Sequence, residues 1–593
     1  MDKTMIPSIK EMTGAEMVIQ ALKDHGVEHI FGYPGGAVLP IYDALFAAAN
    51  ELVHVLVRHE QGAVHAAEGY ARSTGKCGVA LVTSGPGATN AVTGLADALL
   101  DSIPIVVLSG QVATHLIGTD AFQECDTVGI TRPCTKHNWL VKDIADLPRI
   151  LHEAFQIATT GRPGPVVIDI PKDIQFKKGF YVEPGSVSHR TYKPPFEADI
   201  DAISQAVALM ASAKKPIFYT GGGVINAGPA ASEHLRELVE LTGFPVTSTL
   251  MGLGAYPASD DKWLGMLGMH GTYEANWAMH DCDVMIGLGV RFDDRVTGRI
   301  DAFSPGSKKI HVDIDPSQIN KNIRVDLPII ADAGQAIKAM IKVWKQKEYK
   351  ADKKALAEWW EQIERWRAKN CLAYKQNGNG IKPQYAIDRL YELTKNRDTY
   401  ITTEVGQHQM WAAQRYKFEQ PNRWMTSGGL GTMGYGIPAA LGVQLAHRDS
   451  LVIDIAGEGS VQMTMQEMST AVQSNLPIKI FILNNRYLGM VRQWQQLLHG
   501  GRYSHTYSEA LPDFVKMAEA FGCVGIRCDK PEDLDAAILK MIDCPKPVLF
   551  DCIVDQMENC YPMIPSGAAH NEMILCDADE EATQVSDAGK MLV

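Results

Sequence analysis

Two strand-like segments in the C-terminal third of the chain end in side chains that typically bind a hard cation. Residues 450–460, SLVIDIAGEGS, end in a turn that contains Glu458, and residues 477–490, PIKIFILNNRYLGM, contain Asn484 and Asn485. A carboxylate and an amide at the ends of neighbouring parallel strands hold one octahedral cation, while adjacent glycine N–H groups cradle a diphosphate. Oxygen ligands favour Mg²⁺ over zinc. The alternative interpretation is two ordinary strand-end turns in which the asparagines act as a cap.

A carboxylate is also expected at a strand end in the N-terminal third. Residues 57–72, VRHEQGAVHAAEGYAR, have helical spacing from Gln61 on, so Glu60 lies at the helix N-terminus, just beyond the strand-like segment LVHVLV. Taken alone, Glu60 is best explained as a first-turn carboxylate that the helix dipole favours. Residues 78–90, GVALVTSGPGATN, predict a buried strand and a Gly-Pro-Gly turn. Such a turn brings backbone N–H groups close to a ligand.

Residues 429–434, GLGTMG, match the dinucleotide-binding pattern G-x-G-x-x-G, and Asp454 follows about twenty residues later. This motif favours a nicotinamide dehydrogenase, but its context does not. The preceding residues, PNRWMTSG, make a poor strand, and the helix that follows contains Gly436 and Pro438 near its start. The dehydrogenase is therefore an alternative that one motif supports, and the absence of an NAD-dependent absorbance change would exclude it.

A helix, a buried apolar strand and a glycine-containing turn follow one another three times along the chain, and these elements must position the residues above. The three turns lie at residues 32–36, 221–223 and 405–407. This order is typical of open parallel α/β sheets, which bind ligands at the carboxyl ends of their strands. The sequence therefore predicts an α/β fold of three doubly wound parallel-sheet domains.

The domain boundaries follow from two stretches that lack the pattern. Residues 177–198 are rich in proline and glycine and aperiodic, while residues 345–382 are charged and partly helical through ALAEWWEQIERWRAKN. The predicted domains, with an acidic tail at the end, are residues 10–176, 197–345, 380–575 and 576–593.

Composition excludes several classes of protein. The 593 residues are 46% hydrophobic, enough for several cores. A formal net charge of −13 argues against nonspecific binding to nucleic acid or anionic membranes, and no apolar run is long enough to predict a membrane span. The eleven cysteines form no CxxC pair and lack zinc-ribbon spacing. Reduced core thiols and a cytoplasmic location are therefore expected, since the N-terminal residues also lack targeting character.

Taken together, the motifs resemble the thiamine-diphosphate superfamily, and within it the acetohydroxyacid synthase (acetolactate synthase) catalytic subunits. The resemblance runs from about residue 10 to residue 575. It is carried by FGYPGG, RHEQGAVHAAEGYAR, TSGPGATN, DAFQE, GRPGPVVIDIPKD, GMHGTYEAN, GVRFDDRVTG, GQHQMWAAQ, TSGGLGTMGYGIPAALG, QEMSTAVQ, GMVRQWQ and YPMIPSG. It implies that the first domain binds the cofactor's pyrimidine, the second FAD, and the third the diphosphate and Mg²⁺.

The resemblance also implies a reaction. Pyruvate is decarboxylated on thiamine diphosphate, and the two-carbon unit joins pyruvate to give 2-acetolactate, or 2-ketobutyrate to give 2-aceto-2-hydroxybutyrate, on the route to valine, leucine and isoleucine. The FAD is expected to be structural, because the net reaction transfers no electrons. The family further implies a homodimer or homotetramer, with each cofactor between two chains, and a small regulatory subunit as partner.

Site residues are carried over from the family by motif. Glu60 is expected to promote loss of the cofactor's C2 proton, and Phe122, Gln123 and Lys172 to line the pyruvate entrance. Met433 is expected to support the bent cofactor, with the Gly431 carbonyl on the aminopyrimidine. The diphosphate is assigned to Gly406, Gln407, His408, Gly459 and Ser460, with Met490 also at the cofactor, and the metal to Glu458, Asn485 and the Tyr487 carbonyl.

The remaining assignments concern FAD and substrate. The FAD residues are Arg162, His270, Arg291, Asp313 and Asp332, and the substrate residues are Met269, Asp294, Arg295, Val491 and Trp494. Trp494 is expected to favour 2-ketobutyrate, since one methylene against an aromatic wall contributes about 1–3 kcal/mol. Asp294 and Arg295 are expected to pair.

The chain departs from the family at Glu458 and Glu404, where aspartate is usual. The longer carboxylate at Glu458 predicts altered metal binding, because Mg²⁺ demands near-ideal geometry. Other enzymes with this cofactor stay open as alternatives: sulfoacetaldehyde acetyltransferase, pyruvate oxidase, in which FAD is redox-active, and glyoxylate carboligase, which Glu60 disfavours. A non-catalytic binding protein is a further alternative.

Overall fold

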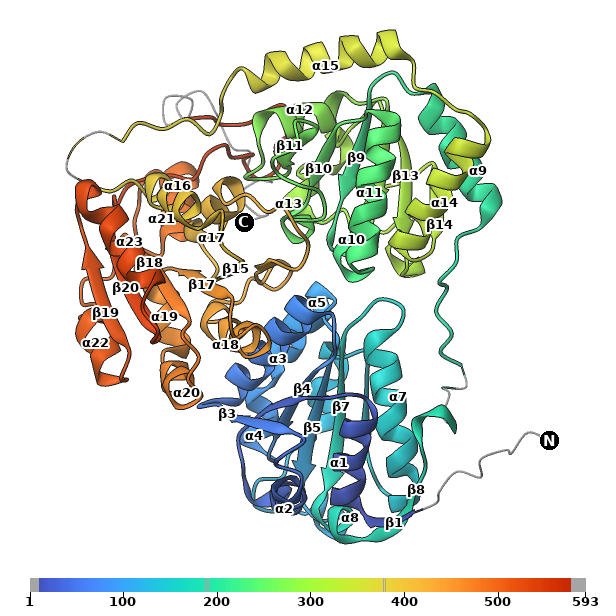
Figure 1. Cartoon of the computed structure of the whole chain (residues 1–593), viewed down its shortest axis with the longest axis vertical. Helices are drawn as coiled ribbons and strands as arrows, with labels where there is room; N and C mark the ends of the chain where they lie inside the picture. The colour runs from blue at the N-terminus through green and yellow to red at the C-terminus, as the bar shows by residue number, and fades with distance from the viewer. Residues whose placement is uncertain (1–9, 187–188, 190, 377, 379, 577–593) are drawn as a thin grey trace.

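In a computed structural model of the chain, residues 10–576 are described except for 187–188, 190, 377 and 379. The predicted acidic tail therefore lies outside the described residues apart from Cys576. Three six-stranded sheets, each wholly parallel, form three α/β domains (Figure 1). The predicted fold class is confirmed.

The N-terminal sheet has strand order β3-β2-β4-β5-β7-β6. Its strands are β2 (His29–Gly32), β3 (Val53–Leu56), β4 (Gly78–Val82), β5 (Ile105–Gln111), β6 (His137–Leu140) and β7 (Pro165–Pro171). Strands β4, β5 and β7 are buried along their whole length, as expected of a parallel sheet covered on both faces. The helices are α1 (Gly14–Asp24), α2 (Leu39–Ala47), α3 (Glu60–Thr74), α4 (Pro86–Asn90), α5 (Val92–Asp101), α6 (Thr127–Thr131), α7 (Leu147–Thr159) and α8 (Lys172–Phe176).

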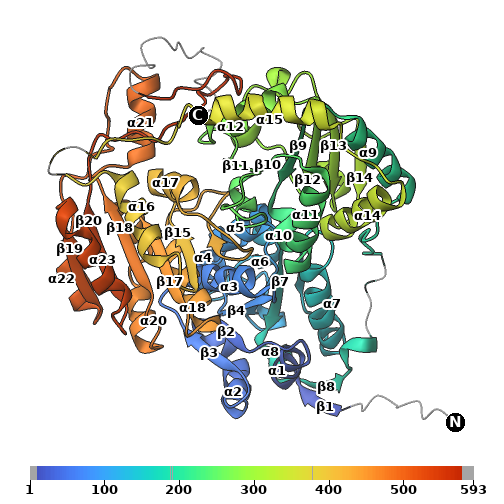
Figure 2. The ribbon, with the colours of Figure 1, turned by 45° about the horizontal axis from the view of Figure 1, so that its top comes forward.

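The central sheet has strand order β11-β10-β9-β12-β13-β14. Its strands are β9 (Pro216–Thr220), β10 (Val246–Ser248), β11 (Trp263–Met266), β12 (Val284–Leu288), β13 (Lys308–Asp313) and β14 (Leu327–Ile330). The helices are α9 (Ile200–Ser212), α10 (Gly222–Asn226), α11 (Pro229–Thr242), α12 (Tyr273–Asp281), α13 (Asp294–Thr297) and α14 (Ala333–Gln346). Helix α15 (Lys353–Arg367) follows, crosses this domain (Figures 1 and 2) and buries Trp359, whose indole donates to the Pro216 carbonyl.

The C-terminal sheet has strand order β16-β15-β17-β18-β20-β19. Its strands are β15 (Thr399–Thr403), β16 (Trp424–Met425), β17 (Leu451–Ala456), β18 (Lys479–Asn484), β19 (Val524–Cys528) and β20 (Val548–Ile553). The helices are α16 (Pro383–Thr394), α17 (Gln407–Arg415), α18 (Gly436–Ala446), α19 (Glu458–Thr464), α20 (Glu467–Gln473), α21 (Gly489–Leu498), α22 (Phe514–Ala520) and α23 (Leu534–Ile542). The short strand before the GLGTMG motif agrees with the weak strand pattern there.

Helices α3 and α18 join the N-terminal and C-terminal domains, and they lie side by side in both ribbon views (Figures 1 and 2). Glycines permit this close approach. A Cβ atom on Gly69 would stand 2.1 Å from the Ala439 carbonyl oxygen, and one on Gly442 would stand 1.9 Å from that of Ala66. The small residues of the 57–72 segment are therefore explained by helix packing between two domains.

The linker prediction for residues 177–198 is wrong at its start. Strand β8 (Lys178–Tyr181) pairs antiparallel with β1 (Lys10–Thr13) in a separate two-stranded sheet. Tyr181 and Met12 are buried there, so two short segments without an alternating pattern are held by packing. The eleven thiols are all free, but only five of them are buried, so the prediction of core thiols holds for fewer than half. Among the described helices, none has the length and apolar character needed to cross a membrane.

Candidate cofactor site and active site

A cavity of about 1440 Å³ lies where the three domains meet. Each strand of the central sheet contributes lining residues at or just beyond its carboxyl end, as do β15 and β16 of the C-terminal sheet. This is the edge at which parallel α/β sheets bind ligands. The cavity brings together these predicted residues: Arg162, Met269, His270, Arg291, Asp294, Arg295, Asp313, Asp332, Gly406, Gly431, Met433, Met490, Val491 and Trp494.

The predicted metal residues lie beside this cavity, at the ends of β17 and β18. Glu458 is the first residue of α19 and is 1% exposed, and its Oε1 atom has no hydrogen-bond partner. Burial raises the pKa of Glu458 to about 7, although the backbone N–H groups of Glu458 and Asn485 oppose the rise. The Asn485 Oδ1 atom accepts from the Tyr487 N–H at 3.0 Å. A buried carboxylate oxygen without a hydrogen-bond partner, next to an amide, fits a binding site for a hard cation.

Two of the predicted diphosphate residues, Gln407 and His408, lie close to the predicted metal residues. The Asn485 amide donates to Gln407 Oε1 at 3.3 Å. The His408 ring lies between two glycines, because Cβ atoms on Gly406 and Gly457 would stand 2.7 and 2.8 Å from its Cε1 atom. Burial lowers the pKa of His408 to about 3, and its Nε2 atom has no partner. The imidazole beside Gly457 therefore has an unpartnered ring nitrogen, which can donate to a phosphate oxygen when it carries the proton.

The loop that carries Gly431 and Met433 is held by the N-terminal domain of the same chain. The Ser427 hydroxyl accepts from the N–H groups of Gly431 at 3.0 Å and Thr432 at 2.8 Å, and donates to Asp97 on α5. One turn further along α5, the Asp101 carboxylate accepts from the N–H groups of Gly428 and Gly429 at 2.8 and 2.7 Å. Sequence reasoning missed both carboxylates, because their partners lie about 330 residues away.

Glu404 holds the other side of this loop, a contact that the sequence analysis did not assign. Its carboxylate is fully buried and accepts from the N–H groups of Gly434 at 2.5 Å and Gly436 at 3.0 Å. Burial raises its pKa to about 7, and the backbone donors oppose that rise. The sequence offered one signal for this contact. Glu404 directly follows the strand-like segment TYITT, and a carboxylate at the end of a buried strand needs a hydrogen-bond partner. Asp454, of the dinucleotide alternative, is also buried, beneath Gly436, and accepts from Thr402.

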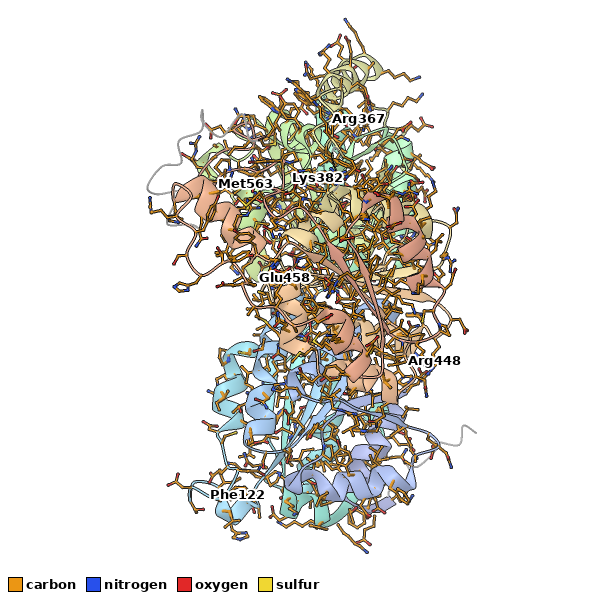
Figure 3. All side chains as sticks on the ribbon, turned by 90° about the vertical axis from the view of Figure 1, so that its left-hand side faces the viewer. Phe122, Arg367, Lys382, Arg448, Glu458 and Met563 are labelled. Atoms are coloured by element: carbon orange, nitrogen blue, oxygen red, sulfur yellow. The ribbon has the colours of Figure 1, made fainter. Side chains whose placement is uncertain are left out.

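The four predicted catalytic residues do not line the cavity in this chain. Glu60 is the first residue of α3 and accepts from Asn90 Nδ2 at 2.9 Å. The Gly-Pro-Gly turn lies between Glu60 and Gln123: a Cβ atom on Gly87 would stand 3.4 Å from Glu60 Oε1, and one on Gly85 2.8 Å from the Gln123 carbonyl oxygen. Lys172 begins α8. Phe122 is 88% exposed, and Figure 3 shows it far from Glu458.

The substrate residues are organised by the segment after β20, which sequence reasoning used only as a motif. The Ile564 N–H donates to the Met269 carbonyl at 2.8 Å, and His270 Nδ1 lies 3.1 Å from the Pro562 carbonyl oxygen. Helix α21 holds the same segment, because Gln493 accepts from the Cys560 N–H at 2.8 Å. Gln493 also accepts from Gln407, so this segment is connected to the predicted diphosphate residues.

The charged lining residues form pairs of different kinds. Asp294 and Arg295 lie 3.8 Å apart, as predicted, but they are 77% and 47% exposed, so the pair contributes little to stability. The Arg295 guanidinium lies 5.7 Å from the Trp494 ring centroid. On the other side of the cavity, Arg162 lies 3.5 Å from Asp315 and donates to Ser102. Arg291 donates to the Leu100 carbonyl at 2.6 Å, and burial raises the pKa of Asp313 to about 6.

Comparison with known proteins identifies the family. Three thiamine pyrophosphate enzyme models match the chain: the N-terminal TPP-binding domain at residues 12–130, the central domain at 203–340 and the C-terminal TPP-binding domain at 404–552. Thiamine pyrophosphate is another name for thiamine diphosphate.

Individual relatives match over nearly their whole length. The acetolactate synthase isozyme 3 large subunit of Escherichia coli (strain K12) is 52% identical over 569 residues, which is 95% of this chain and 98% of the relative. The acetolactate synthase large subunit of Haemophilus influenzae is 50% identical over 577 residues, 97% of this chain and 100% of the relative. That of Pyropia yezoensis is 47% identical over 569 residues, 95% of each. The chain belongs to the acetolactate synthase large-subunit family of thiamine pyrophosphate enzymes.

Proposed function

We propose that the chain decarboxylates pyruvate on thiamine diphosphate and transfers the two-carbon unit to a second 2-keto acid. The products are 2-acetolactate from pyruvate and 2-aceto-2-hydroxybutyrate from 2-ketobutyrate. The observation that carries this proposal is the buried group of Glu458, Asn485 and His408, in which Glu458 Oε1 and His408 Nε2 have no hydrogen-bond partner. When bound, thiamine diphosphate supplies the nucleophilic carbon and accepts the electrons left by CO₂.

The residues of the C-terminal domain would hold this cofactor and Mg²⁺. Glu458, Asn485 and the Tyr487 carbonyl would be the metal ligands, and Gly406, Gln407, His408, Gly459 and Ser460 would contact the diphosphate. Met433 and Gly431 face the cavity from the loop that Glu404, Asp97 and Ser427 hold. Because side chains of this chain itself hold the loop, they support the position of Met433 beneath a bent cofactor.

A homodimer is the proposed active unit. The cavity is lined by the predicted FAD and substrate residues and by Gly406, Gly431, Met433 and Met490, whereas Glu60, Phe122, Gln123 and Lys172 do not line it. A second chain would bring these four residues to the cavity, and the exposed Phe122 agrees with burial by a partner. Glu60 then serves as the proton-transfer partner of the aminopyrimidine. Assembly into a tetramer and binding of a small regulatory subunit are proposed from the family.

The central domain would hold FAD in a structural role. The cavity extends along the ends of all six central strands, past Arg162, Arg291, Asp313 and Asp332. The two guanidinium groups suit a diphosphate, and a carboxylate at a strand end suits a ribose hydroxyl. On the substrate side, Arg295 stacked near Trp494 would meet the 2-keto acid carboxylate while the indole meets its alkyl group.

One assay tests this function. Purified protein is incubated with pyruvate, Mg²⁺, thiamine diphosphate and FAD, and acetolactate is measured as acetoin after acidification. We expect acetoin to form, and its formation to require pyruvate, Mg²⁺ and thiamine diphosphate. Consumption of oxygen or a quinone with pyruvate, without acetoin, would instead identify a pyruvate oxidase. Absence of thiamine diphosphate binding would leave a non-catalytic protein.

A second measurement tests the metal site. Glu458 is one methylene longer than the aspartate usual in the family, and Mg²⁺ tolerates poor geometry badly. We expect Glu458→Asp to bind Mg²⁺ more tightly than the natural chain, with a smaller change for Mn²⁺. Indistinguishable activation curves would show that the longer side chain is accommodated.

A further inference from the structure

The carboxylate of Glu467 lies at the start of helix α3, although it belongs to the C-terminal domain. Glu467 is the first residue of α20 and is fully buried. Its Oε1 and Oε2 atoms accept from the Arg58 N–H at 3.0 and 3.3 Å, and Oε2 also accepts from the Thr470 hydroxyl at 2.7 Å. Arg58 is two residues before Glu60, so the contact holds the backbone just before this side chain.

Two further contacts show that Glu467 and α20 pack closely against the segment that leads into α3. A Cβ atom on Gly62 would stand 2.5 Å from Glu467 Oε1, so any other residue at position 62 would displace the carboxylate. The Arg58 guanidinium also donates to Gln473, the last residue of α20. Both ends of α20 therefore contact the segment that leads into α3. The Glu467 carboxylate lies at the N-terminus of α3, where the dipole of that helix favours a negative charge.

We propose that Glu467 is a positioning residue for Glu60. The proposal rests on the function given above, in which Glu60 acts on the cofactor held by the partner subunit. The diphosphate-binding domain of each chain then sets the orientation of the carboxylate that the same chain gives to its neighbour. Since α20 follows α19, which begins at Glu458, the predicted metal residue and the positioning residue for Glu60 lie on two consecutive helices of one chain.

The first test uses Glu467→Gln, which keeps the shape and loses the charge. We expect the exchange of the cofactor's C2 proton with deuterium to slow about tenfold or more, because this step needs Glu60 in place. Thiamine diphosphate and Mg²⁺ affinities should stay within about twofold, since Glu467 contacts neither predicted binding set. Amide hydrogen exchange of residues 56–62 without cofactor should accelerate. Glu519→Gln, on the exposed face of α22, is the control.

Gly62→Ala tests the same contact without touching the carboxylate. Alanine favours a helix over glycine by about 1 kcal/mol, so a general loss of helix stability is not expected. The methyl group should push Glu467 away from the Arg58 N–H and slow C2 exchange. In the Glu467→Ala background the methyl group has room, so the double variant should exchange no more slowly than Glu467→Ala alone.

Two results would overturn the proposal. One is unchanged C2 exchange in Glu467→Gln, and the other is an equal effect of Gly62→Ala with and without Glu467. Failure of the proposed function is distinguishable, because Glu60→Gln must first abolish C2 exchange in the loaded enzyme. If the natural chain shows no C2 exchange, the function itself is wrong, whereas accelerated amide exchange at residues 56–62 still tests the contact.

Discussion

The hydroxyl of Ser427 donates to Asp97 Oδ1 at 2.5 Å and thereby joins helix α5 of the N-terminal domain to the loop that carries Met433. The same hydroxyl accepts two backbone N–H groups of that loop. One small side chain therefore gives the buried Thr432 N–H its acceptor, also accepts from the Gly431 N–H, and shares Asp97 Oδ1 with the Thr432 hydroxyl. The cofactor loop of the C-terminal domain is consequently built partly by the N-terminal domain.

Ser427→Ala should weaken cofactor binding more than it alters the fold. Removing the hydroxyl leaves the N–H groups of Gly431 and Thr432 without their acceptor, at a cost of about 1–3 kcal/mol. Because this cost falls on the loop beside the cavity, we expect thiamine diphosphate to bind about tenfold more weakly, which corresponds to about 1.4 kcal/mol. Titration of tryptophan fluorescence measures this. Ser450→Ala, outside the cavity, should bind normally; equal affinities of both variants would contradict the role.

Glu404→Gln should loosen the opposite side of the same loop. Gly434 donates to one oxygen of the Glu404 carboxylate, and Gly436 and Ile437 donate to the other. An amide nitrogen replaces one of these oxygens, so in either orientation it removes an acceptor and opposes the N–H group or groups on that side. We expect a higher cofactor concentration for half-maximal activity and a smaller effect of Glu404→Asp, which keeps both oxygens and the charge. Activity titrated against thiamine diphosphate at saturating pyruvate checks this. A larger effect of the aspartate variant would show that side-chain length, and not charge, matters.

Glu60→Gln and Glu458→Gln should each be inactive alone and active when mixed. In a hybrid dimer, one site has both defects and the other has none, because Glu60 and Glu458 of one chain serve different sites. Half of randomly assembled dimers are hybrids with one intact site, so we expect about a quarter of the natural activity. Coexpression of the two variants and assay of acetoin measure this. Activity no higher than that of either variant alone would contradict a shared site.

The sequence predicted the three sheets because several strands, among them β2, β4 and β9, are short apolar runs that lead into a glycine-containing turn. The carboxyl ends of parallel strands converge on one edge, so the strand pattern also predicted that Glu458 and Asn485 would lie together. Gln407, to which the Asn485 amide donates, was assigned only through the family resemblance. Asp97, Asp101 and Glu467 could not be predicted in this way. Their partners lie hundreds of residues away and are mostly backbone N–H groups, which carry no side-chain pattern.

The antiparallel pair of β1 and β8 shows the same limit in the fold. Neither four-residue segment has the alternation that marks a strand, and their pairing depends on packing of Met12 and Tyr181 against the first domain. The location of Glu60 was predicted at the helix start, but its separation from the cavity was visible only from the arrangement of the domains.

Asp169→Asn should stabilise the chain at alkaline pH. Burial raises the pKa of Asp169 from its ordinary value of 3.8 to about 7, although Gln111, Ser109 and Thr127 oppose this. The folded state therefore binds a proton that the unfolded state releases between about pH 4 and 7, so the natural chain loses stability as pH rises through this window. Above pH 7 the loss is complete, at most about 4 kcal/mol.

Thermal unfolding midpoints at pH 5 and pH 8 measure the effect of Asp169→Asn. The asparagine oxygen can still accept from Gln111 Nε2, which lies 2.9 Å from Asp169 Oδ2, so the main contact is kept. We expect the midpoint of the variant to exceed that of the natural chain by more at pH 8 than at pH 5. An advantage that grows towards acid pH would contradict the raised pKa.

Trp494→Leu should reduce the preference for 2-ketobutyrate over pyruvate as the second substrate. Trp494 is half-buried on α21, lines the cavity and lies 5.7 Å from the Arg295 guanidinium, so the indole presents an apolar wall beside a cation that attracts carboxylates. One methylene against such a wall contributes about 1–3 kcal/mol, so we expect the product ratio to fall about tenfold while formation of 2-acetolactate continues. The two products are quantified after incubation with both substrates. Tyr503→Leu is the control, because it removes an aromatic ring that does not line the cavity and should leave the product ratio unchanged. If Trp494→Leu also leaves the product ratio unchanged, other residues set the preference.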